Sequence, residues 1–220
     1  MIKSITIILQ LLLLAGCKTP VSALTNDKDC AAPDERQAML DIAIESEIDA
    51  MCQISDFEQI SGEPIIDFET MTDFVKRYNK DFSSEIARCY IEIGRVYGIK
   101  GDMAFCQAIL ETGWFKFEGG TAVKASQHNY CGLGVGRRGS RGESFATISD
   151  GVTAHIQHLY AYVTDKSLPE GERLLDPRFN MVRRGCASTW HDLNMRWAMN
   201  NTYADAILRL YQKLVDFASK

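Results

Sequence analysis

The chain has 220 residues and a formal net charge of -5 at neutral pH. This length suits one globular domain with an appendage, and a hydrophobic content of 46% is enough to build a core. Because phosphate binding needs a basic surface, the acidic balance argues against nucleic acid as a partner.

Residues 1–16 predict an export signal. Lys3 supplies a short basic region, and the apolar run that follows is too short for a transmembrane helix of about 20 residues. The run ends in Leu14-Ala15-Gly16-Cys17, which resembles the lipobox of bacterial lipoproteins and predicts a lipid on Cys17. An ordinary signal peptide, cut nearby after Ala23, is the alternative. Either form places the mature protein outside the cytoplasm, and the lipid would anchor it to the bacterial cell envelope.

Residues 17–33 are small and polar, and they predict a tether between this anchor and the folded part. Residues 34–64 predict an N-terminal helical extension, because apolar residues recur at helical spacing as far as Ile54. Six cysteines remain after lipidation of Cys17, an even number in a compartment that permits disulfides. They form either a disulfide framework or, where they lie on apolar helical faces as Cys89 and Cys106 do, part of a reduced core.

Helical spacing dominates residues 65–220 and predicts a mainly α (α+β) domain. The expected helices run from Glu69 to Tyr78, from Ser83 to Tyr97 with a stop at Gly98, from Asp102 as cap to Gly119-Gly120, from Ser149 to about Val163, and from Ala204 to Phe217. Between Asn129 and Ile148 two short alternating runs flank a glycine-rich turn, which predicts a small β-hairpin lobe.

The helix that starts near Asp102 is apolar on more than one face, which predicts burial, and Glu111 is the acidic residue in its interior. A buried carboxylate must find a partner or hold its proton, because burial raises its pKa. A carboxyl group that keeps its proton at neutral pH can act as a general acid. The alternative is a structural Glu that pairs with an Arg or caps a neighbouring helix.

The segment from Gly134 to Gly139 matches G-x-G-x-x-G, but no apolar helix and no second βα unit follow it. The pattern therefore does not predict a dinucleotide site. The arginines of this loop, Arg137, Arg138 and Arg141, predict a solvated turn, and the alternative is that they meet carboxylates of a substrate.

Cys131 with His155 or His158 does not predict a cysteine peptidase dyad, because Cys131 does not start a helix. The two histidines are three residues apart on a helix and have no third ligand nearby, which argues against a zinc site. We therefore expect no metal and no cofactor.

Several ordered motifs resemble one known family. Ala104 to Trp114, followed by Asn129 to Gly134, looks like the glucosaminidase domains of glycoside hydrolase family 73, which belong to the lysozyme-like superfamily. Further matches follow in order: Asp150-Gly151 with the helix to Tyr160, Asp176-Pro177-Arg178-Phe179 with Arg184-Gly185 in a form similar to clostridial members, and Trp197-Ala198 followed by Tyr203. The resemblance covers roughly Ile65 to Lys220.

The resemblance implies a lysozyme-like helical domain with a small β-hairpin lobe. It also implies an endo-β-N-acetylglucosaminidase that cuts peptidoglycan at the β-1,4 bond between N-acetylglucosamine and N-acetylmuramic acid. Glu111 matches the catalytic Glu of the family and would protonate the leaving oxygen, and Tyr203 matches its functional Tyr. We expect the substrate to contact Trp114, Asn129, Tyr130, Phe145 and Trp197, of which the aromatic members suit flat sugar faces.

The group that acts opposite Glu111 stays open. Glycosidases place a second carboxylate about 5–5.5 Å away when they retain configuration and about 6.5–9.5 Å away when they invert it. Glu143, on the expected hairpin, is the candidate, and Glu118 and Asp150 are weaker alternatives. Without a second carboxylate, the N-acetyl group of the substrate would attack, with Tyr203 orienting it.

Two other functions compete with hydrolysis. A lytic transglycosylase of the same superfamily uses one Glu, and a non-catalytic peptidoglycan-binding lipoprotein would keep the fold without the chemistry. In each case the expected partners are glycan strands and a membrane reached through the lipid on Cys17, and we expect a monomer.

Overall fold

The computed structural model describes residues 33–136 and 141–220, except for the side chains of residues 33–36 and 47–55. The predicted signal at residues 1–16, the lipidated Cys17, the tether up to residue 32, and the loop arginines Arg137 and Arg138 lie outside the described residues. They stay predictions. Among the helices that are described, none is long and apolar enough to cross a membrane.

The chain divides into two units, Met1–Ile48 and Asp49–Lys220. Helix α2, Pro33–Glu58, confirms the helix that the sequence predicts at the start of the chain's folded part. Its described side chains from residue 37 to residue 46 are all exposed. The predicted domain boundaries at residues 34 and 65 stay predictions.

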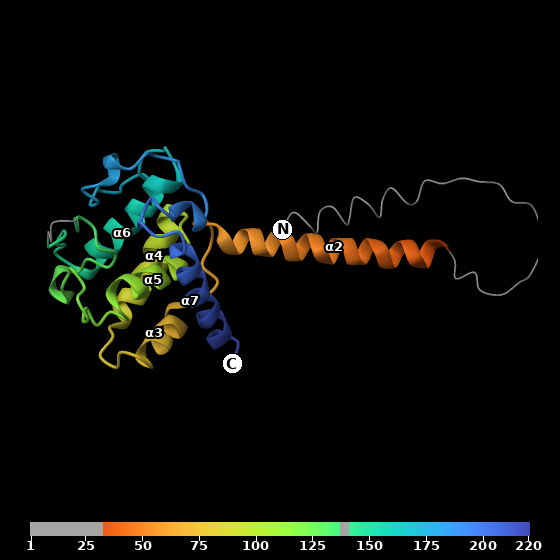
Figure 1. The fold of residues 1–220 in the computed structure, drawn as a ribbon, viewed down its shortest axis with the longest axis horizontal. Coiled ribbons are helices and arrows are strands. Elements are labelled where there is room, and N and C mark those ends of the chain that lie inside the picture. The colour runs from red at the N-terminus through yellow and green to blue at the C-terminus, as the bar shows by residue number, and fades with distance from the viewer. Residues whose placement is uncertain (1–32, 137–140) are drawn as a thin grey trace, which may run out of the picture. The chain divides into compact units, whose positions relative to one another are not determined.

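The second unit is mainly helical, which confirms the predicted fold class (Figure 1). Its elements are α3 (Phe68–Lys76), α4 (Ser84–Tyr97), α5 (Gly101–Thr112), α6 (Ile148–Val163) and α7 (Tyr203–Ala218), with three short 3-10 helices, η1 (Ala125–Gln127), η2 (Phe179–Met181) and η3 (His191–Leu193). Helix α5 packs against α4 and α7, and α4 also packs against α3 and α6. The helix that carries Glu111 is therefore central in this unit.

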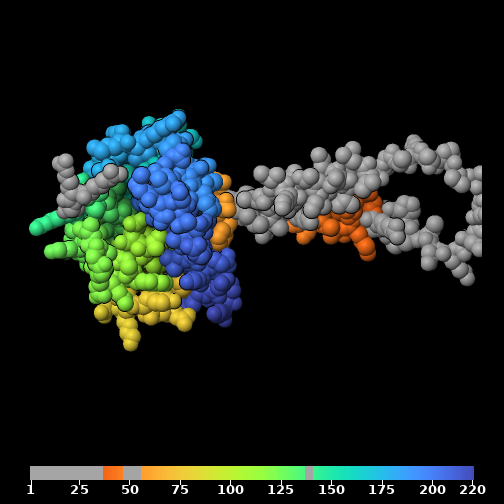
Figure 2. Space-filling view, in the orientation of Figure 1, coloured from red at the N-terminus to blue at the C-terminus, as the bar shows by residue number. Residues whose placement is uncertain are grey.

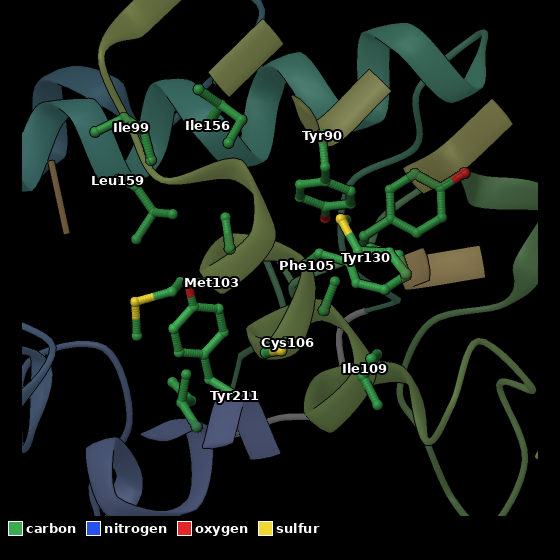
Figure 3. Close-up of a cluster of buried hydrophobic side chains, with 14 of the residues drawn as sticks. Tyr90, Ile99, Met103, Phe105, Cys106, Ile109, Tyr130, Ile156, Leu159 and Tyr211 are labelled. Atoms are coloured by element: carbon green, nitrogen blue, oxygen red, sulfur yellow. The ribbon is translucent and has the colours of Figure 1, made fainter. Parts of the chain in front are cut away.

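The core forms around α5, as the apolar pattern of its sequence predicts. All residues from Gly101 to Ile109 are buried. Figure 3 shows Met103, Phe105 and Cys106 of α5 among side chains of α4, α6 and α7. Figure 2 shows the C-terminal segment, in blue, on the surface beside the green segment that contains α5.

Helix α5 differs from the prediction at both ends. Asp102 does not cap it, because the N-cap position is Lys100 and the Asp102 carboxylate accepts backbone N–H groups of Ile65 and Ile66 instead. The helix ends at Thr112 rather than at Gly119, because Gly113 adopts the left-handed conformation, with φ 59°, that closes many helices. Glu111 therefore lies in the last turn of α5 and not in its interior.

The segment expected to be a β-hairpin folds back on itself, but its described residues do not form strands. The backbone N–H of Glu143 donates to the carbonyl of Leu133 at 2.8 Å, which joins the two arms. The buried side chain of Asn129 takes several further hydrogen bonds, donating to the carbonyls of Leu133 and Glu143 and accepting the N–H of Leu133. A side chain that bonds the backbone in this way replaces the ladder of a sheet.

Candidate active site

A pocket of about 330 Å³ lies beside the end of α5. Its walls come from α5, α6, the loop after Asn129 and the segment before α7, and they include Glu111, Cys131, His158, Arg178, Arg196 and Trp197. Among the residues that the structure describes, Glu111 is the only carboxylate that lines this pocket. The pocket therefore presents one acid to whatever binds there.

Glu111 is paired with Tyr203, the first residue of α7. The hydroxyl of Tyr203 donates to Oε1 of Glu111 at 2.5 Å. Burial raises the pKa of Glu111 above its ordinary value, and hydrogen bonds from Tyr203 and Trp197 offset part of that rise. The position of Glu111 in the last turn of α5, where the helix dipole is negative, also disfavours its anion. These effects favour a carboxyl group that keeps its proton.

A chain of buried hydrogen bonds runs from Tyr203 into the core. The Nε2 group of Gln107 donates to the hydroxyl of Tyr203 at 2.8 Å. Nε2 of His155 lies 2.9 Å from Oε1 of Gln107, and the hydroxyl of Tyr90 lies 2.7 Å from Nδ1 of His155. Tyr90, Gln107 and His155 have no exposed surface. Glu111 is thus linked through four consecutive hydrogen bonds to the centre of the domain.

His155 is the neutral imidazole in this series of hydrogen bonds. Burial lowers its pKa to about 3, and the charge of His158 acts in the same direction. A neutral imidazole has one N–H donor and one acceptor. When the Gln107 amide directs its N–H toward Tyr203, its carbonyl oxygen faces His155, and this arrangement requires the His155 proton to be on Nε2.

A second buried pair stands in the pocket wall. Nδ1 of His158 lies 2.7 Å from Oδ2 of Asp176, which is 1% exposed. The other oxygen of Asp176 accepts the backbone N–H of Arg178 at 2.8 Å. Asp176 therefore fixes both the His158 ring and the loop that brings Arg178 to the pocket.

The structure brings three of the predicted site residues together: Glu111, Tyr203 and Trp197. Trp197 lines the pocket, and its ring lies 5.6 Å from that of His155 and 4.9 Å from that of His158, measured between centroids. It is half-buried, with part of the indole open to the pocket. This is the arrangement in which an aromatic face can contact a sugar.

Three other predicted contact residues do not line the pocket. Asn129 is buried and uses its amide to hold the loop that forms one wall. Tyr130 is 2% exposed and packs on Tyr90 and Phe115. Phe145 packs in a small cluster beneath that loop.

Trp114 lies elsewhere in the domain. Its ring stacks on Tyr78 with 3.7 Å between centroids, and its carbonyl accepts from Asn79. The early end of α5 explains this placement, because the chain turns through left-handed φ values of 63° at Trp114 and 57° at Phe115. Trp114 is not among the residues that line the Glu111 pocket.

The carboxylates considered as partners of Glu111 also lie outside the pocket lining. A Cβ atom on Gly134 would meet Oε1 of Glu143 at 2.8 Å, so the side chain of Glu143 lies against Gly134, a residue of the pocket wall, without lining the pocket itself. Asp150 pairs with Arg173 at 3.2 Å near the start of α6, and Glu118 is exposed.

The described cysteines Cys89, Cys106, Cys131 and Cys186 are unpaired, so they favour the reduced alternative, whereas Cys30 and Cys52 lie outside the described side chains. Cys131 and His158 both line the pocket. Burial raises the pKa of Cys131 well above its ordinary value, and the charge of Glu111 acts in the same direction. A thiol held in this form is a poor nucleophile, in agreement with the rejection of a peptidase dyad.

The sequence alone indicates no site role for Gln107, Tyr90 or Arg196, and the motif that contains Asp176 and Arg178 gives a family match without a role for either. One signal was present, because Gln107 lies four residues before Glu111 and therefore on the same helical face. The spacing of the α6 histidines suggests only metal binding or a peptidase dyad and does not indicate their hydrogen-bond partners. Nothing in the spacing of Tyr90 indicates its contact, which spans 65 positions.

Comparison with known proteins gives one family and one relative. The model of the glucosaminidase family, described as mannosyl-glycoprotein endo-beta-N-acetylglucosaminidase, matches residues 87–215, more than half of the chain. An uncharacterized protein of Borreliella burgdorferi is 34% identical over 139 residues, which cover 63% of this chain and 66% of that relative. The chain thus spans just under two thirds of the relative's length. No solved structure matches the chain.

Proposed function

Because the chain belongs to the glucosaminidase family, we propose that it is a peptidoglycan hydrolase that cleaves the β-1,4 bond between N-acetylglucosamine and N-acetylmuramic acid. The observation that carries this proposal is the state of Glu111: a pocket carboxyl whose pKa is raised by burial and whose Oε1 accepts from Tyr203. A protonated carboxyl beside a sugar-sized pocket is the general acid that glycoside cleavage requires.

Glu111 acts first as the acid. With Oε1 occupied by the Tyr203 hydroxyl, its proton is carried on Oε2 and passes to the bridging oxygen as the bond from that oxygen to C1 breaks. Trp197 contacts the sugar from the adjacent wall of the pocket. After cleavage the Glu111 carboxylate takes a proton from the incoming water, which restores the acid.

The N-acetyl group of the substrate is the proposed nucleophile. Glu111 is the only carboxylate lining the pocket within the described chain, and this supports a mechanism with one protein carboxylate. The carbonyl oxygen of the acetamide bonds to C1 while the leaving oxygen departs, and water then opens the resulting ring to give a reducing N-acetylglucosamine. The alternative, with Glu143 as the second carboxylate, stays a prediction.

A lytic transglycosylase is the second candidate, because the same single carboxylate would serve it. In that reaction a hydroxyl of the muramic acid residue attacks instead of water. Its product carries an anhydro-muramic end, which differs from the hydrolysis product by the mass of one water molecule.

The cellular setting is also a proposal. We place the protein outside the cytoplasm, anchored to the envelope through a lipid on Cys17, as the Leu14–Cys17 motif predicts. A Cys17→Ser variant should lose metabolic labelling with a fatty acid and appear in the soluble extracytoplasmic fraction. Labelling that persists in the variant would contradict the anchor.

Digestion of purified peptidoglycan tests the activity. The wild-type protein should release fragments with reducing N-acetylglucosamine ends, identified by borohydride reduction and mass spectrometry, and Glu111→Gln should lose about 100-fold to 10,000-fold in rate. Glu118→Gln, an exposed Glu in the following turn, is the matched control and should keep full activity. Unchanged activity of Glu111→Gln would overturn the proposal, and anhydro-muramic ends would favour the second candidate.

Glu143→Gln separates the two hydrolytic routes. The substrate-assisted route predicts a loss of less than about tenfold, whereas removal of a catalytic carboxylate predicts a loss comparable to that of Glu111→Gln.

A further inference from the structure

A second pocket of about 290 Å³ adjoins the Glu111 pocket. The two share the wall residues His158, Tyr162, Arg178 and Arg196. A ligand that fills the first pocket can therefore extend into the second without leaving the protein surface. Met181, Val182, Arg183 and Cys186 complete the lining of the second pocket.

The second pocket is strongly basic. Arg178, Arg183 and Arg196 line it, and no described carboxylate lies within 4.0 Å of any of the three guanidinium groups. Asp176, a carboxylate behind this wall, is buried and bonded to His158. Arg196 donates to the backbone carbonyl of Asp192 at 2.8 Å, and its charge also acts on the Asp192 carboxylate. In a chain whose net charge is -5, this gathering of guanidinium groups does not follow from composition.

Arg178 and Arg196 act electrostatically on Tyr162, a residue of the wall that the two pockets share. Burial raises the pKa of Tyr162, which stands in the shared wall, and the charges of Arg178 and Arg196 act against that rise. Guanidinium groups suit carboxylates because two parallel N–H donors match the two carboxylate oxygens. The exposed arginines of this wall can therefore pair with a carboxylate of a bound ligand.

We propose that this basic pocket binds carboxylate groups of the peptides that branch from peptidoglycan strands, beside the bond that Glu111 cleaves. The proposal rests on the proposed function, because it takes the strand in the Glu111 pocket as the source of the branch. A muramic acid residue carries its peptide through a lactyl ether, so a strand seated at Glu111 brings a peptide to the adjoining wall. The enzyme would then distinguish strands by their peptides and not only by their sugars.

The test compares strands that carry peptides with strands stripped of them by an amidase. Arg183→Gln changes a residue of the second pocket that does not line the first. In the Glu111→Gln background, Arg183→Gln should weaken binding of peptide-bearing strands about tenfold, the effect of one charge-assisted hydrogen bond, and leave binding of stripped strands unchanged. Arg209→Gln, an exposed arginine on α7, is the matched control and should change neither.

Binding of both substrates weakened alike would overturn the proposal, as would unchanged binding of the peptide-bearing strands. Weakening confined to the stripped strands would assign the pocket to the free lactyl carboxylate instead and would also overturn it. Because binding is measured in an inactive background, failure of the proposed hydrolysis leaves this result intact and appears separately, as absence of fragment release by the wild type.

The buried hydrogen-bond chain carries a second, independent inference, about how Tyr203 is oriented. The Tyr203 hydroxyl has one proton, so it donates to Glu111 when Gln107 presents a donor to it, and it can donate to Gln107 instead when Gln107 presents its carbonyl oxygen. The reverse order, in which every bond of the chain changes direction, is equally compatible with the heavy-atom distances. Whatever sets the direction therefore decides whether Tyr203 donates to Glu111.

Tyr90 sets this direction. Its hydroxyl is buried, and among the described residues His155 is its only hydrogen-bond partner. The hydroxyl proton must therefore go to Nδ1 of His155, because in the reverse order it would have no acceptor. His155 then carries its proton on Nε2, Gln107 accepts with its carbonyl, and Tyr203 is left to donate to Glu111. Figure 3 shows Tyr90 deep in the core, beside Phe105 and Tyr130.

We infer that Tyr90, His155 and Gln107 are positioning residues, which act through Tyr203 to keep the acidic proton of Glu111 on the oxygen that faces the substrate. The inference rests on the proposed function only for its effect on rate. The direction of the chain is a property of the folded protein and can be measured without substrate.

Tyr90→Phe tests this inference. Nitrogen-15 NMR of the His155 ring should show the proton on Nε2 in the wild type and a substantial Nδ1–H population in Tyr90→Phe. In the pH–rate profile, the falling limb that reports ionisation of Glu111 should move to higher pH, because a Tyr203 hydroxyl that no longer donates to Glu111 no longer lowers its pKa. We also expect kcat to fall about tenfold.

Tyr97→Phe is the matched control, because it removes another buried hydroxyl of α4. This hydroxyl bonds Gln157 and Glu172, which are not part of the hydrogen-bond series from Tyr90 to Glu111. This control should change neither the position of the proton on the His155 ring nor the falling limb of the pH–rate profile. An unchanged His155 tautomer in Tyr90→Phe would overturn the inference, as would an equal change in Tyr97→Phe. If the wild type hydrolyses nothing, the NMR result still decides.

Discussion

Nδ1 of His158 and Oδ2 of Asp176 lie 2.7 Å apart in the wall that separates the Glu111 pocket from the core. Both residues are buried, and Asp176 also accepts the backbone N–H of Arg178. One buried carboxylate thus supports a helix residue and a loop residue of the same site.

Removal of that carboxylate should destabilise the domain. Asp176→Ala leaves a buried imidazole and a backbone N–H without their acceptor, and we expect a loss of about 3 kcal/mol in the free energy of unfolding. Asp176→Asn, which keeps one acceptor oxygen, should lose about 1 kcal/mol. Urea unfolding followed by circular dichroism measures both, and equal midpoints for Asp176→Ala and the wild type would show that the pair contributes nothing.

Tyr203→Phe should slow the reaction and shift its pH profile. Without the phenol, Glu111 loses a hydrogen bond that lowers its pKa, so the acid keeps its proton to higher pH and the falling limb of kcat/KM moves upward. We expect kcat to fall about tenfold to 100-fold, because the carboxyl also loses its orientation.

Tyr211→Phe is the control for this experiment. It removes a second buried phenol of α7, which bonds Asp102 at 2.9 Å. This variant should lose stability, and the falling limb of its kcat/KM profile should stay at the pH of the wild type. A limb that moves equally in both variants would mean that the shift reflects general loosening of α7.

Glu111→Gln should become more stable relative to the wild type as the pH rises. The folded-state pKa of Glu111 lies above its ordinary value of 4.5, so the unfolded chain ionises first and the wild type loses stability as the pH rises through the folded-state value. The glutamine variant has no such loss. Its melting temperature relative to wild type should therefore be higher at pH 7.5 than at pH 4, and a difference that does not vary with pH would contradict the raised pKa.

Gly151→Ala should disrupt the start of α6. A Cβ atom there would lie 1.8 Å from the backbone carbonyl oxygen of His128, which cannot move without displacing the loop that forms the pocket wall. We expect a loss of at least about 1–3 kcal/mol. Gly171→Ala, where a Cβ meets nothing within 4 Å and only the positive φ opposes it, should lose less. Equal losses in thermal unfolding would argue that backbone strain and not the close contact decides.

Sequence reasoning predicted the helices whose boundaries depend on local signals. Helix α4 stops at Gly98, which adopts the left-handed cap conformation, and α7 follows from its apolar spacing. The prediction for helix α5 was wrong at both ends, and the start was wrong for a non-local reason. The carboxylate of Asp102 accepts hydrogen bonds from the backbone N–H groups of Ile65 and Ile66 and from the hydroxyl of Tyr211. These residues are distant in sequence and come near Asp102 only in the folded protein.

The same division applies to the site. Glu111 was indicated by its apolar surroundings, and the family resemblance pointed to Tyr203; the structure joins the two. The placement of Trp114 could not be predicted, because a tryptophan with a positive φ is unfavourable locally and persists only where surrounding contacts enforce it. The partners of His155 come from α4 and α5, so helical spacing alone could not connect them.

The bond between Glu111 and Tyr203 joins positions that are 92 residues apart, and Tyr203 opens the last helix of the chain. During synthesis the acid therefore emerges long before its phenol, and the pair is complete only when the final helix has formed and docked. A chain released early, or trimmed at its C-terminus before residue 203, carries the acid without the group that orients it.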